Sequence, residues 1–163
     1  MGETKKKQQQ AKADIDQKFA MARPNRQILE DLAVACAKDP SPDNTFQYAF
    51  CLSKSPERSE LRYAITILDG LVKEGYEHQM DCMYGGACAF YLLEDYDRCR
   101  ERCENILRSN PESRLTMELH LACIEAKEQK EAELMKKTAI GGAVAMGALG
   151  VAGAVASVLL AKR

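Results

Sequence analysis

The feature that most constrains this chain is a stretch of 24 residues without a charged side chain near its C-terminal end, at residues 138–161. At about 1.5 Å rise per residue, a helix of this length measures about 36 Å and can cross a hydrocarbon core of about 30 Å. Lys136 and Lys137 precede the stretch, and Lys162 and Arg163 follow it. Long basic side chains at both ends can reach the lipid headgroups. The sequence therefore predicts a transmembrane helix over residues 138–161.

Two other structures for this glycine-rich stretch fit less well. A phosphate-binding loop requires a preceding β-strand and ends in a lysine with a hydroxyl residue. The segment KEQKEAELMKK before the stretch has instead the charge pattern of a helix. A core helix normally keeps one polar face, and this stretch has none. The membrane span remains the preferred interpretation.

The order of the segments predicts a tail-anchored protein. Two residues follow the predicted span, and the opening segment MGETKKKQQQ lacks the apolar core of a secretory signal. We therefore expect an N-terminal arm, partly disordered or helical, at 1–25, a cytosolic helical domain at 26–137, the anchor at 138–161 and a basic end at 162–163. A weakly apolar span rich in Gly and Ala favours the thin mitochondrial outer membrane over the plasma membrane.

Composition argues against several classes of function. Residues 1–137 carry 21 basic and 24 acidic side chains, a net charge of −3. A surface that binds nucleic acid must neutralise phosphates, so nucleic acid is not expected as a partner. His78 and His120 lack the context of a zinc ligand or of a nucleophile's base. No catalytic residue, metal site or cofactor site is predicted.

The seven cysteines have no CxxC spacing. They are Cys36, Cys51, Cys82, Cys88, Cys99, Cys103 and Cys123. Disulfides are not expected in a domain that faces the cytosol, so we interpret the cysteines as small apolar packing residues. Cys99 and Cys103 are one helical turn apart, and a shared metal ion is the alternative interpretation for that pair.

Apolar residues recur at helical spacing through the domain, which predicts an all-α fold. We expect a six-helix bundle with two tandem tetratricopeptide-like helix pairs, whose outer faces are capped by flanking helices, plus one C-terminal transmembrane helix. The second pair runs from Met80 to Pro111, close to the repeat length of about 34 residues. Its small residues Ala87 and Cys99 permit a close helix crossing.

The segments also occur in the order of one known family. FQYAFCL, YAITILDGLV and FYLLEDYDRCRERCENILRSNPES are followed by a double lysine and a Gly/Ala-rich span with a basic end. Over residues 26–163 the chain resembles the mitochondrial fission one protein family, whereas its first 26 residues differ from the usual arm of that family. The resemblance implies a cytosolic tetratricopeptide-like domain anchored in the mitochondrial outer membrane, and also on peroxisomes. It implies binding of a dynamin-related GTPase, its adaptor or a GTPase-activating protein, and no catalysis.

A groove on the concave face is the predicted partner site, because the first helix of each pair lines that face. The predicted partner-binding residues are Phe46, Phe50, Ser53, Tyr84, Cys88 and Tyr91. An aromatic groove suits a partner helix or an extended peptide. The alternative is that these side chains are ordinary core residues, since helical aromatics are commonly buried.

The predicted span carries a row of small residues on one helical face. The row comprises Ala143, Gly147, Gly150, Ala154 and Ser157. Such a row lets two helix backbones approach closely in a bilayer and favours a homo-oligomer, or it merely lowers the hydrophobicity of the span. A passive membrane anchor that associates through its tail, without a partner in the groove, is the alternative function.

Overall fold

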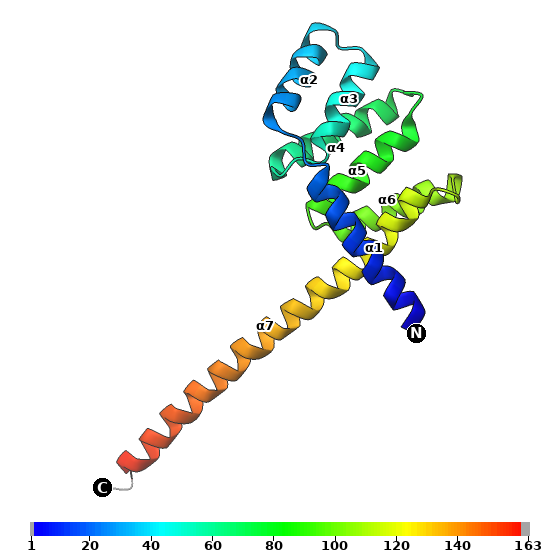
Figure 1. The fold of residues 1–163 in the computed structure, drawn as a ribbon. Coiled ribbons are helices and arrows are strands. Elements are labelled where there is room, and N and C mark those ends of the chain that lie inside the picture. Colours follow the sequence, from blue (N-terminus) through cyan, green and yellow to red (C-terminus); the bar gives the residue numbers. More distant parts are fainter. Residues whose placement is uncertain (1, 161–163) are drawn as a thin grey trace. The chain divides into compact units, whose positions relative to one another are not determined.

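The computed structural model describes the backbone of residues 2–160 and the side chains of residues 2–141. Every regular element in this part of the chain is an α-helix (Figure 1). The helices are α1 (Gly2–Met21), α2 (Arg26–Lys38), α3 (Pro42–Leu52), α4 (Arg58–Lys73), α5 (Gln79–Leu92), α6 (Tyr96–Ser109) and α7 (Arg114–Leu160). The all-α class is confirmed, but the predicted count of six helices in the domain is wrong.

The additional helix is α1, which forms within the expected N-terminal arm; of the two states predicted for that arm, partly disordered or helical, the structure has the helical one. Ala11, Ile15 and Phe19 are spaced one helical turn apart and are 6%, 1% and 8% exposed. They pack into the largest core cluster of the domain. A helix in water gains most of its stability from packing of an apolar face, and this three-residue face is what orders the N-terminal segment.

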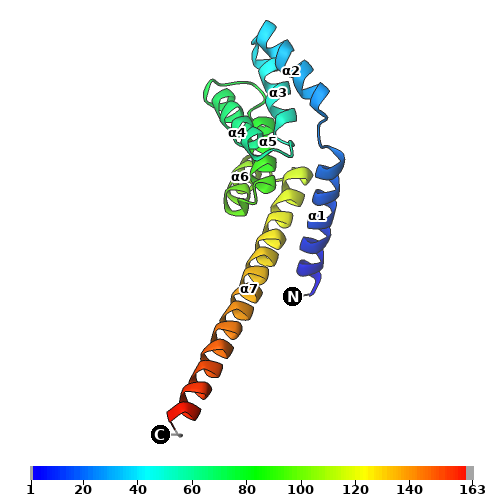
Figure 2. The same ribbon diagram turned by 90° about the vertical axis from the view of Figure 1, so that its left-hand side faces the viewer.

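Residues 1–127 form one compact unit. Within it α2 to α6 stack in chain order (Figure 1), and α1 runs along the side of the stack away from α4 and α6 (Figure 2). The crossings within the α3–α4 and α5–α6 pairs carry small residues. Ala49, Ala64, Ala87 and Cys99 are all fully buried. The close crossings expected of tandem pairs are therefore present.

Two bidentate ion pairs connect helices across the stack. Arg102 of α6 donates to both carboxylate oxygens of Asp69 on α4, at 2.6 and 3.2 Å. Arg26 of α2 does the same to Glu60 on α4, at 2.6 and 3.1 Å. Partly exposed pairs of this kind contribute about 1 kcal/mol or less, so the buried apolar clusters account for most of the stability.

A disulfide between Cys99 on α6 and Cys123 on α7 contradicts the expectation that all cysteines are unpaired. Their Cα atoms are 6.7 Å apart, which is within bonding range for a disulfide. Two residues 24 positions apart meet only because α6 and α7 cross there. The packing role holds for Cys82, Cys88 and Cys103, which are fully buried.

The second unit, residues 128–163, contains the C-terminal part of α7. The side chains of residues 128–141 are exposed, including Leu134 at 64% and Met135 at 73%. Among the residues that the structure describes, no helix is both long enough and apolar enough to cross a membrane. The predicted span at 138–161 and its row of small residues lie largely beyond the described side chains.

Candidate functional site

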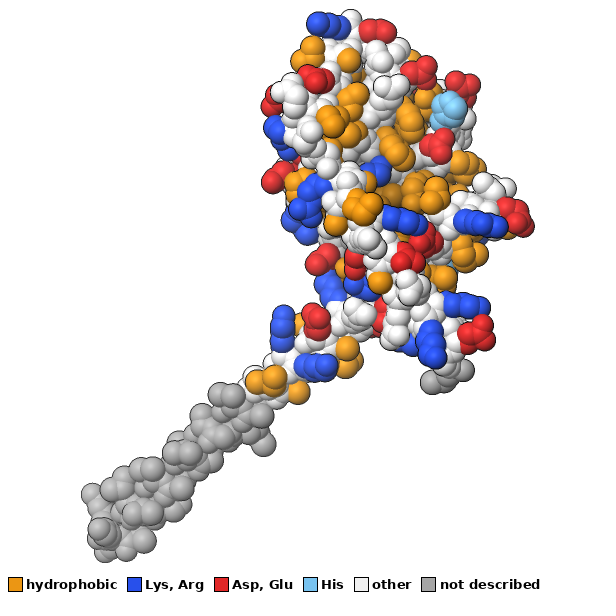
Figure 3. Space-filling view, viewed as in Figure 1, with side chains coloured by type: hydrophobic (Ala, Val, Ile, Leu, Met, Phe, Trp, Pro, Cys, Tyr) orange, Lys and Arg blue, Asp and Glu red, His pale blue; other side chains and the backbone are white. Residues whose placement is uncertain are grey.

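An aromatic cluster lies on α3 and on the segment that connects α4 to α5. It consists of Phe46, Phe50, Tyr76 and His78. Phe46 lies 5.2 Å from Phe50 and 5.6 Å from Tyr76 between ring centroids, and Tyr76 lies 5.3 Å from His78. Phe46, Phe50 and Tyr76 are half-buried, and His78 is exposed. On the face shown in Figure 3, hydrophobic side chains gather over α3 and α5. The cluster therefore presents aromatic surface to solvent.

Neighbouring residues hold this cluster in place. Phe46 and Phe50 are four residues apart and so lie on one face of α3. A Cβ atom at Gly85 of α5 would lie only 2.9 Å from the Phe50 ring, so the missing side chain gives that ring its space. Tyr76 donates its hydroxyl hydrogen bond to Asp43 Oδ1 at 2.8 Å. Desolvation, with a smaller effect of Asp43, raises the pKa of Tyr76 to about 12.

Lys54, directly after α3, adds a positive charge beside the aromatic cluster. Its Nζ lies 3.5 Å from the centroid of the Phe50 ring and donates to the Phe50 carbonyl oxygen at 3.1 Å. Burial lowers the pKa of Lys54, because a less hydrated site disfavours the ammonium form. An aromatic face and a carbonyl stabilise the cation, but neither one neutralises it.

The α5 part of the predicted groove is covered by α1. The Phe19 ring lies 5.6 Å from the Tyr91 ring between centroids, and Tyr91 donates its hydroxyl hydrogen bond to Asp16 Oδ1 at 2.8 Å. Burial raises the pKa of Tyr91, and its bond to Asp16 acts in the same direction. An ion pair of 2.5 Å between Lys18 and Glu118 joins α1 to the first turns of α7. The chain itself thus occupies this section of the face.

The six residues predicted to bind a partner fall into two groups. Phe46, Phe50 and Tyr84 are half-buried, whereas Ser53, Cys88 and Tyr91 are buried. Ser53 is the C-terminal cap of α3 and donates to the Phe50 carbonyl oxygen at 2.6 Å. Cys88 belongs to the main core cluster. In this conformation only the half-buried group offers its side chains to a partner, and its role in binding stays a prediction.

The sequence did not predict a site role for Asp16, Phe19, Lys54, Tyr76 or His78. The signal for Phe19 was its spacing from Ala11 and Ile15 in an otherwise polar helix. For Tyr76 the signal was the preceding Gly75, whose φ of +78° ends α4 in a tight turn. No local signal indicated the role of Asp16, because its partner Tyr91 is distant in sequence. Lys54 lies four residues after Phe50, and that spacing was the available signal.

The basic residues predicted to flank the membrane are only partly covered by the structure. Lys136 and Lys137 lie on α7 in the second unit, with exposed side chains. Lys162 and Arg163 lie outside the described residues.

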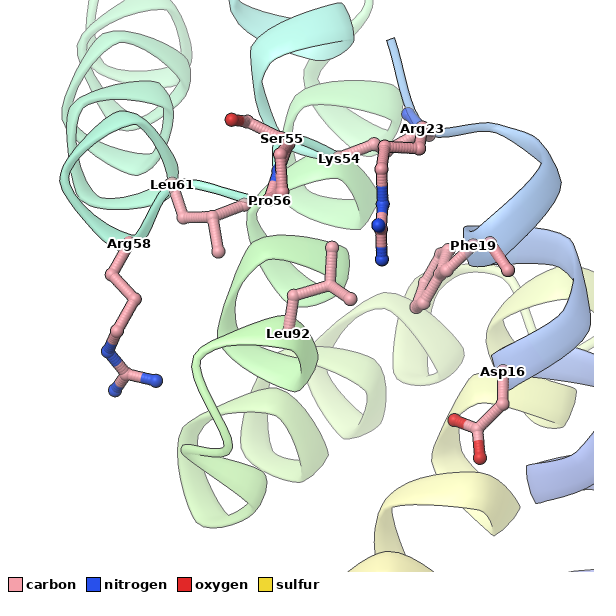
Figure 4. Close-up of a pocket in the computed structure, with 10 residues that line it drawn as sticks. Asp16, Phe19, Arg23, Lys54, Ser55, Pro56, Arg58, Leu61 and Leu92 are labelled. Atoms are coloured by element: carbon pink, nitrogen blue, oxygen red, sulfur yellow. The ribbon is translucent and has the colours of Figure 1, made fainter.

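A pocket of about 420 Å³ opens where α1 ends. Phe19, Leu61 and Leu92 provide its apolar part, and Arg23 points into the space between Phe19 and Leu92 (Figure 4). Lys54 lines the same pocket. The pocket therefore combines apolar side chains with positive charge, and it lies next to the aromatic cluster through Lys54.

The sequence of this chain is similar to those of several known proteins. No protein-family model matches the sequence. The FIS1-related protein fis-1 of Caenorhabditis elegans is 32% identical over 128 residues, which cover 76% of this chain and 87% of that protein. The mitochondrial fission 1 protein of Debaryomyces hansenii is 27% identical over 136 residues, with coverages of 83% and 84%. That of Homo sapiens is 29% identical over 114 residues, with coverages of 69% and 73%.

Solved structures share the same fold. The crystal structure of fission protein Fis1 from Saccharomyces cerevisiae superposes with a TM-score of 0.63 at 20% identity and covers 72% of this chain and 95% of that chain. Yeast Fis1 in complex with an Mdv1 fragment gives a TM-score of 0.62 at 23% identity, with coverages of 70% and 94%. At these identities the structural likeness establishes the fold, while the sequence relatives establish the family.

Proposed function

This chain belongs to the mitochondrial fission 1 protein family, and on that premise we propose that it is a membrane-tethered docking protein for the machinery that divides mitochondria. The observation that carries the proposal is the aromatic cluster, whose rings Phe46, Phe50 and Tyr76 remain half-exposed on a stack of packed helices. Aromatic side chains in such positions are typical anchors for a partner segment.

The partner class is an adaptor, a dynamin-related GTPase or a GTPase-activating protein. The yeast Fis1 structure in complex with an Mdv1 fragment supports the adaptor class. We expect the partner segment to contact Phe46 and Phe50 on α3 and Tyr84 on α5. Because Phe19 and Asp16 of α1 already contact Tyr91, contact with that residue requires α1 to move. The function includes no chemical step and no cofactor.

The second part of the proposal is the membrane anchor. Residues 138–161 cross the mitochondrial outer membrane, and the same span also serves on peroxisomes, with the compact unit of residues 1–127 in the cytosol. The absence of charge over these residues and the basic residues on both sides support this assignment.

Recruitment in cells tests the docking function. We would express the full-length chain with Phe46→Ala and Phe50→Ala in cells that lack their own copy. The matched control is Tyr63→Ala, which removes an aromatic ring that is 56% exposed on α4 and outside the aromatic cluster. The double variant should reach the membrane but recruit less adaptor and dynamin-related GTPase, and mitochondria should elongate. Normal recruitment by a folded double variant would favour the passive anchor instead.

A further inference from the structure

Two neighbouring pockets on the residue 1–127 unit share one arginine. The pocket of about 420 Å³ at the end of α1 is lined by Arg23, Lys54 and Arg58. A second pocket, of about 300 Å³, is lined by Arg58, Arg62 and Arg98. Arg58 lies at the edge of the first pocket in Figure 4 and belongs to both. These five cations, here called the basic band, run from the end of α1 across the start of α4 to the start of α6.

Most of these cations lack a carboxylate partner. In the described part of the chain, no ion pair involves Arg23, Lys54, Arg58 or Arg62, whereas Arg98 pairs with Asp95 at 3.6 Å. Lys54 donates to the Phe50 carbonyl oxygen at 3.1 Å, and Arg58 donates to the Leu93 carbonyl oxygen at 3.1 Å. These carbonyls belong to the C-terminal ends of α3 and α5, where a helix carries only about half a negative charge. The carbonyls orient the cations without neutralising them.

The carboxylates that line the two pockets are already engaged. Asp16 accepts the Tyr91 hydroxyl at 2.8 Å and pairs with Lys12 at 2.6 Å. Asp95 is the N-terminal cap of α6 and accepts from the Arg98 backbone N–H at 3.3 Å. The band thus holds five cations and two engaged carboxylates, one of which already pairs with Arg98, in a chain whose net charge is −1. The positive charge of the band is a local feature and not a property of the whole surface.

Apolar side chains lie between the cations. Phe19, Leu61 and Leu92 line the first pocket, and the second contains three more. These are Ile65, Phe90 and Leu93. An extended peptide turns every second side chain toward such a surface, and those side chains can meet cations and apolar residues in turn. An ion pair at a partly desolvated cation such as Lys54 is stronger than one in bulk water.

We propose that the basic band binds an extended acidic segment of the partner protein, with Asp or Glu side chains against Lys54, Arg58 and Arg62 and apolar side chains in the two pockets. This inference rests on the docking function proposed above and names the chemistry of the segment that docks. The aromatic cluster and the basic band meet at Lys54, so one continuous segment can contact both.

Selection from a random library of 12-residue peptides tests this inference directly. The target is the full-length chain in nanodiscs of neutral phosphatidylcholine, and empty nanodiscs remove membrane binders. We expect the selected peptides to carry a clear excess of Asp and Glu. Fluorescence anisotropy should show that Lys54→Met with Arg58→Gln weakens their binding by about tenfold or more. Replacing the acids of the peptide with Gln or Asn should cause a comparable loss.

The matched control is Lys38→Gln with Lys73→Gln, which removes the same charge from residues outside both pockets. It should leave peptide affinity within about twofold, since long-range electrostatics is largely screened at physiological salt. Selected peptides without an acidic excess would overturn the inference. An equal loss of peptide affinity in the Lys54/Arg58 variant and in the control variant would also overturn it. The same holds if no selected peptide depends on the basic band for binding. If binding instead depends on Phe50 alone, docking at the aromatic cluster stands and acid recognition fails.

Discussion

Tyr91 on α5 donates its hydroxyl hydrogen bond to Asp16 on α1, at 2.8 Å between the two oxygens. The same ring lies 5.6 Å from Phe19 between centroids. One residue that the sequence placed in an open groove is therefore one of the contacts that hold the N-terminal helix. The ring and the hydroxyl group of Tyr91 both contact α1. Changing each one separately therefore distinguishes the contribution of packing from that of the hydrogen bond.

Tyr91→Phe keeps the ring and removes the hydrogen bond to Asp16. We expect the free energy of unfolding to fall by about 0.5–1.5 kcal/mol, the net value of one hydrogen bond. Urea unfolding followed by circular dichroism measures this change. Protease sensitivity near Met21 should rise as α1 loosens. The hydrogen bond is unimportant for docking α1 if stability and cleavage both match the wild type.

Gly85→Ala and Gly86→Ala should change the stability of the domain differently, although the two residues are adjacent on α5. In both variants the higher helix propensity of alanine contributes about 1 kcal/mol. At Gly85 the new Cβ lies 2.9 Å from the Phe50 ring and 3.0 Å from a methyl group of Leu68, both packed groups. At Gly86 it meets only the guanidinium end of Arg102, at 2.5 Å.

Overpacking at Gly85 should cost about 1–3 kcal/mol and outweigh the gain in propensity. The flexible Arg102 side chain can shift, so Gly86→Ala should be close to neutral. Parallel thermal melts of the two variants measure the contrast. Equal melting temperatures would show that the Phe50 ring is free to move away from α5.

Glu60 should make stability depend on pH in the acid range. The hydrogen bonds that Glu60 accepts from Arg26 hold the pKa of Glu60 below the ordinary value of 4.5, and the Ser55 hydroxyl adds to the effect. A carboxylate with a lowered folded-state pKa contributes stability above its unfolded pKa and loses it as the pH falls through the folded value.

The difference in unfolding free energy between the wild type and Glu60→Gln should therefore be constant from neutral pH down to about 4.5 and shrink below that. Denaturant titrations over pH 3–7 measure it. Glu57→Gln serves as the control because no ion pair or side-chain hydrogen bond involves the Glu57 carboxylate in the described part of the chain. A difference independent of pH would contradict the ionic origin of the contact.

Reduction of the Cys99–Cys123 disulfide should destabilise the domain. The bond closes a loop across a sequence separation of 24 residues, for which loop entropy predicts about 3 kcal/mol. Thermal melts with and without a phosphine reductant measure the loss. Cys36→Ser is a control because Cys36 is a free thiol outside the main core cluster. Absence of any shift after confirmed reduction would show that packing alone joins α6 to α7.

Removal of residues 138–163 should release the protein from membranes. The expected reason is loss of the charge-free segment, and cell fractionation of the truncated and full-length chains measures it. Lys162→Ser with Arg163→Ser should keep membrane insertion while shifting part of the protein to the endoplasmic reticulum. A truncated chain that still sediments with mitochondria would show that another region holds it there.

The helical class and the tandem pairs were readable from the sequence because they depend on local spacing. Leu61, Ala64, Leu68 and Leu71 repeat every three or four residues, and all four are buried on α4. The small residues at the crossings, such as Ala87, were also visible, because close backbone approach excludes larger side chains. The same order of segments carries the resemblance to the family, which the sequence relatives establish.

Tertiary structure alone decided which surfaces are covered. The same helical spacing that places Tyr91 on the predicted groove face also fits a core position, and only the docking of α1 distinguishes the two. The Cys99–Cys123 bond and the gathering of the basic band from the ends of three helices likewise depend on the assembled fold. Periodicity identifies one face of each helix, but contacts between helices far apart in sequence determine what lies against that face.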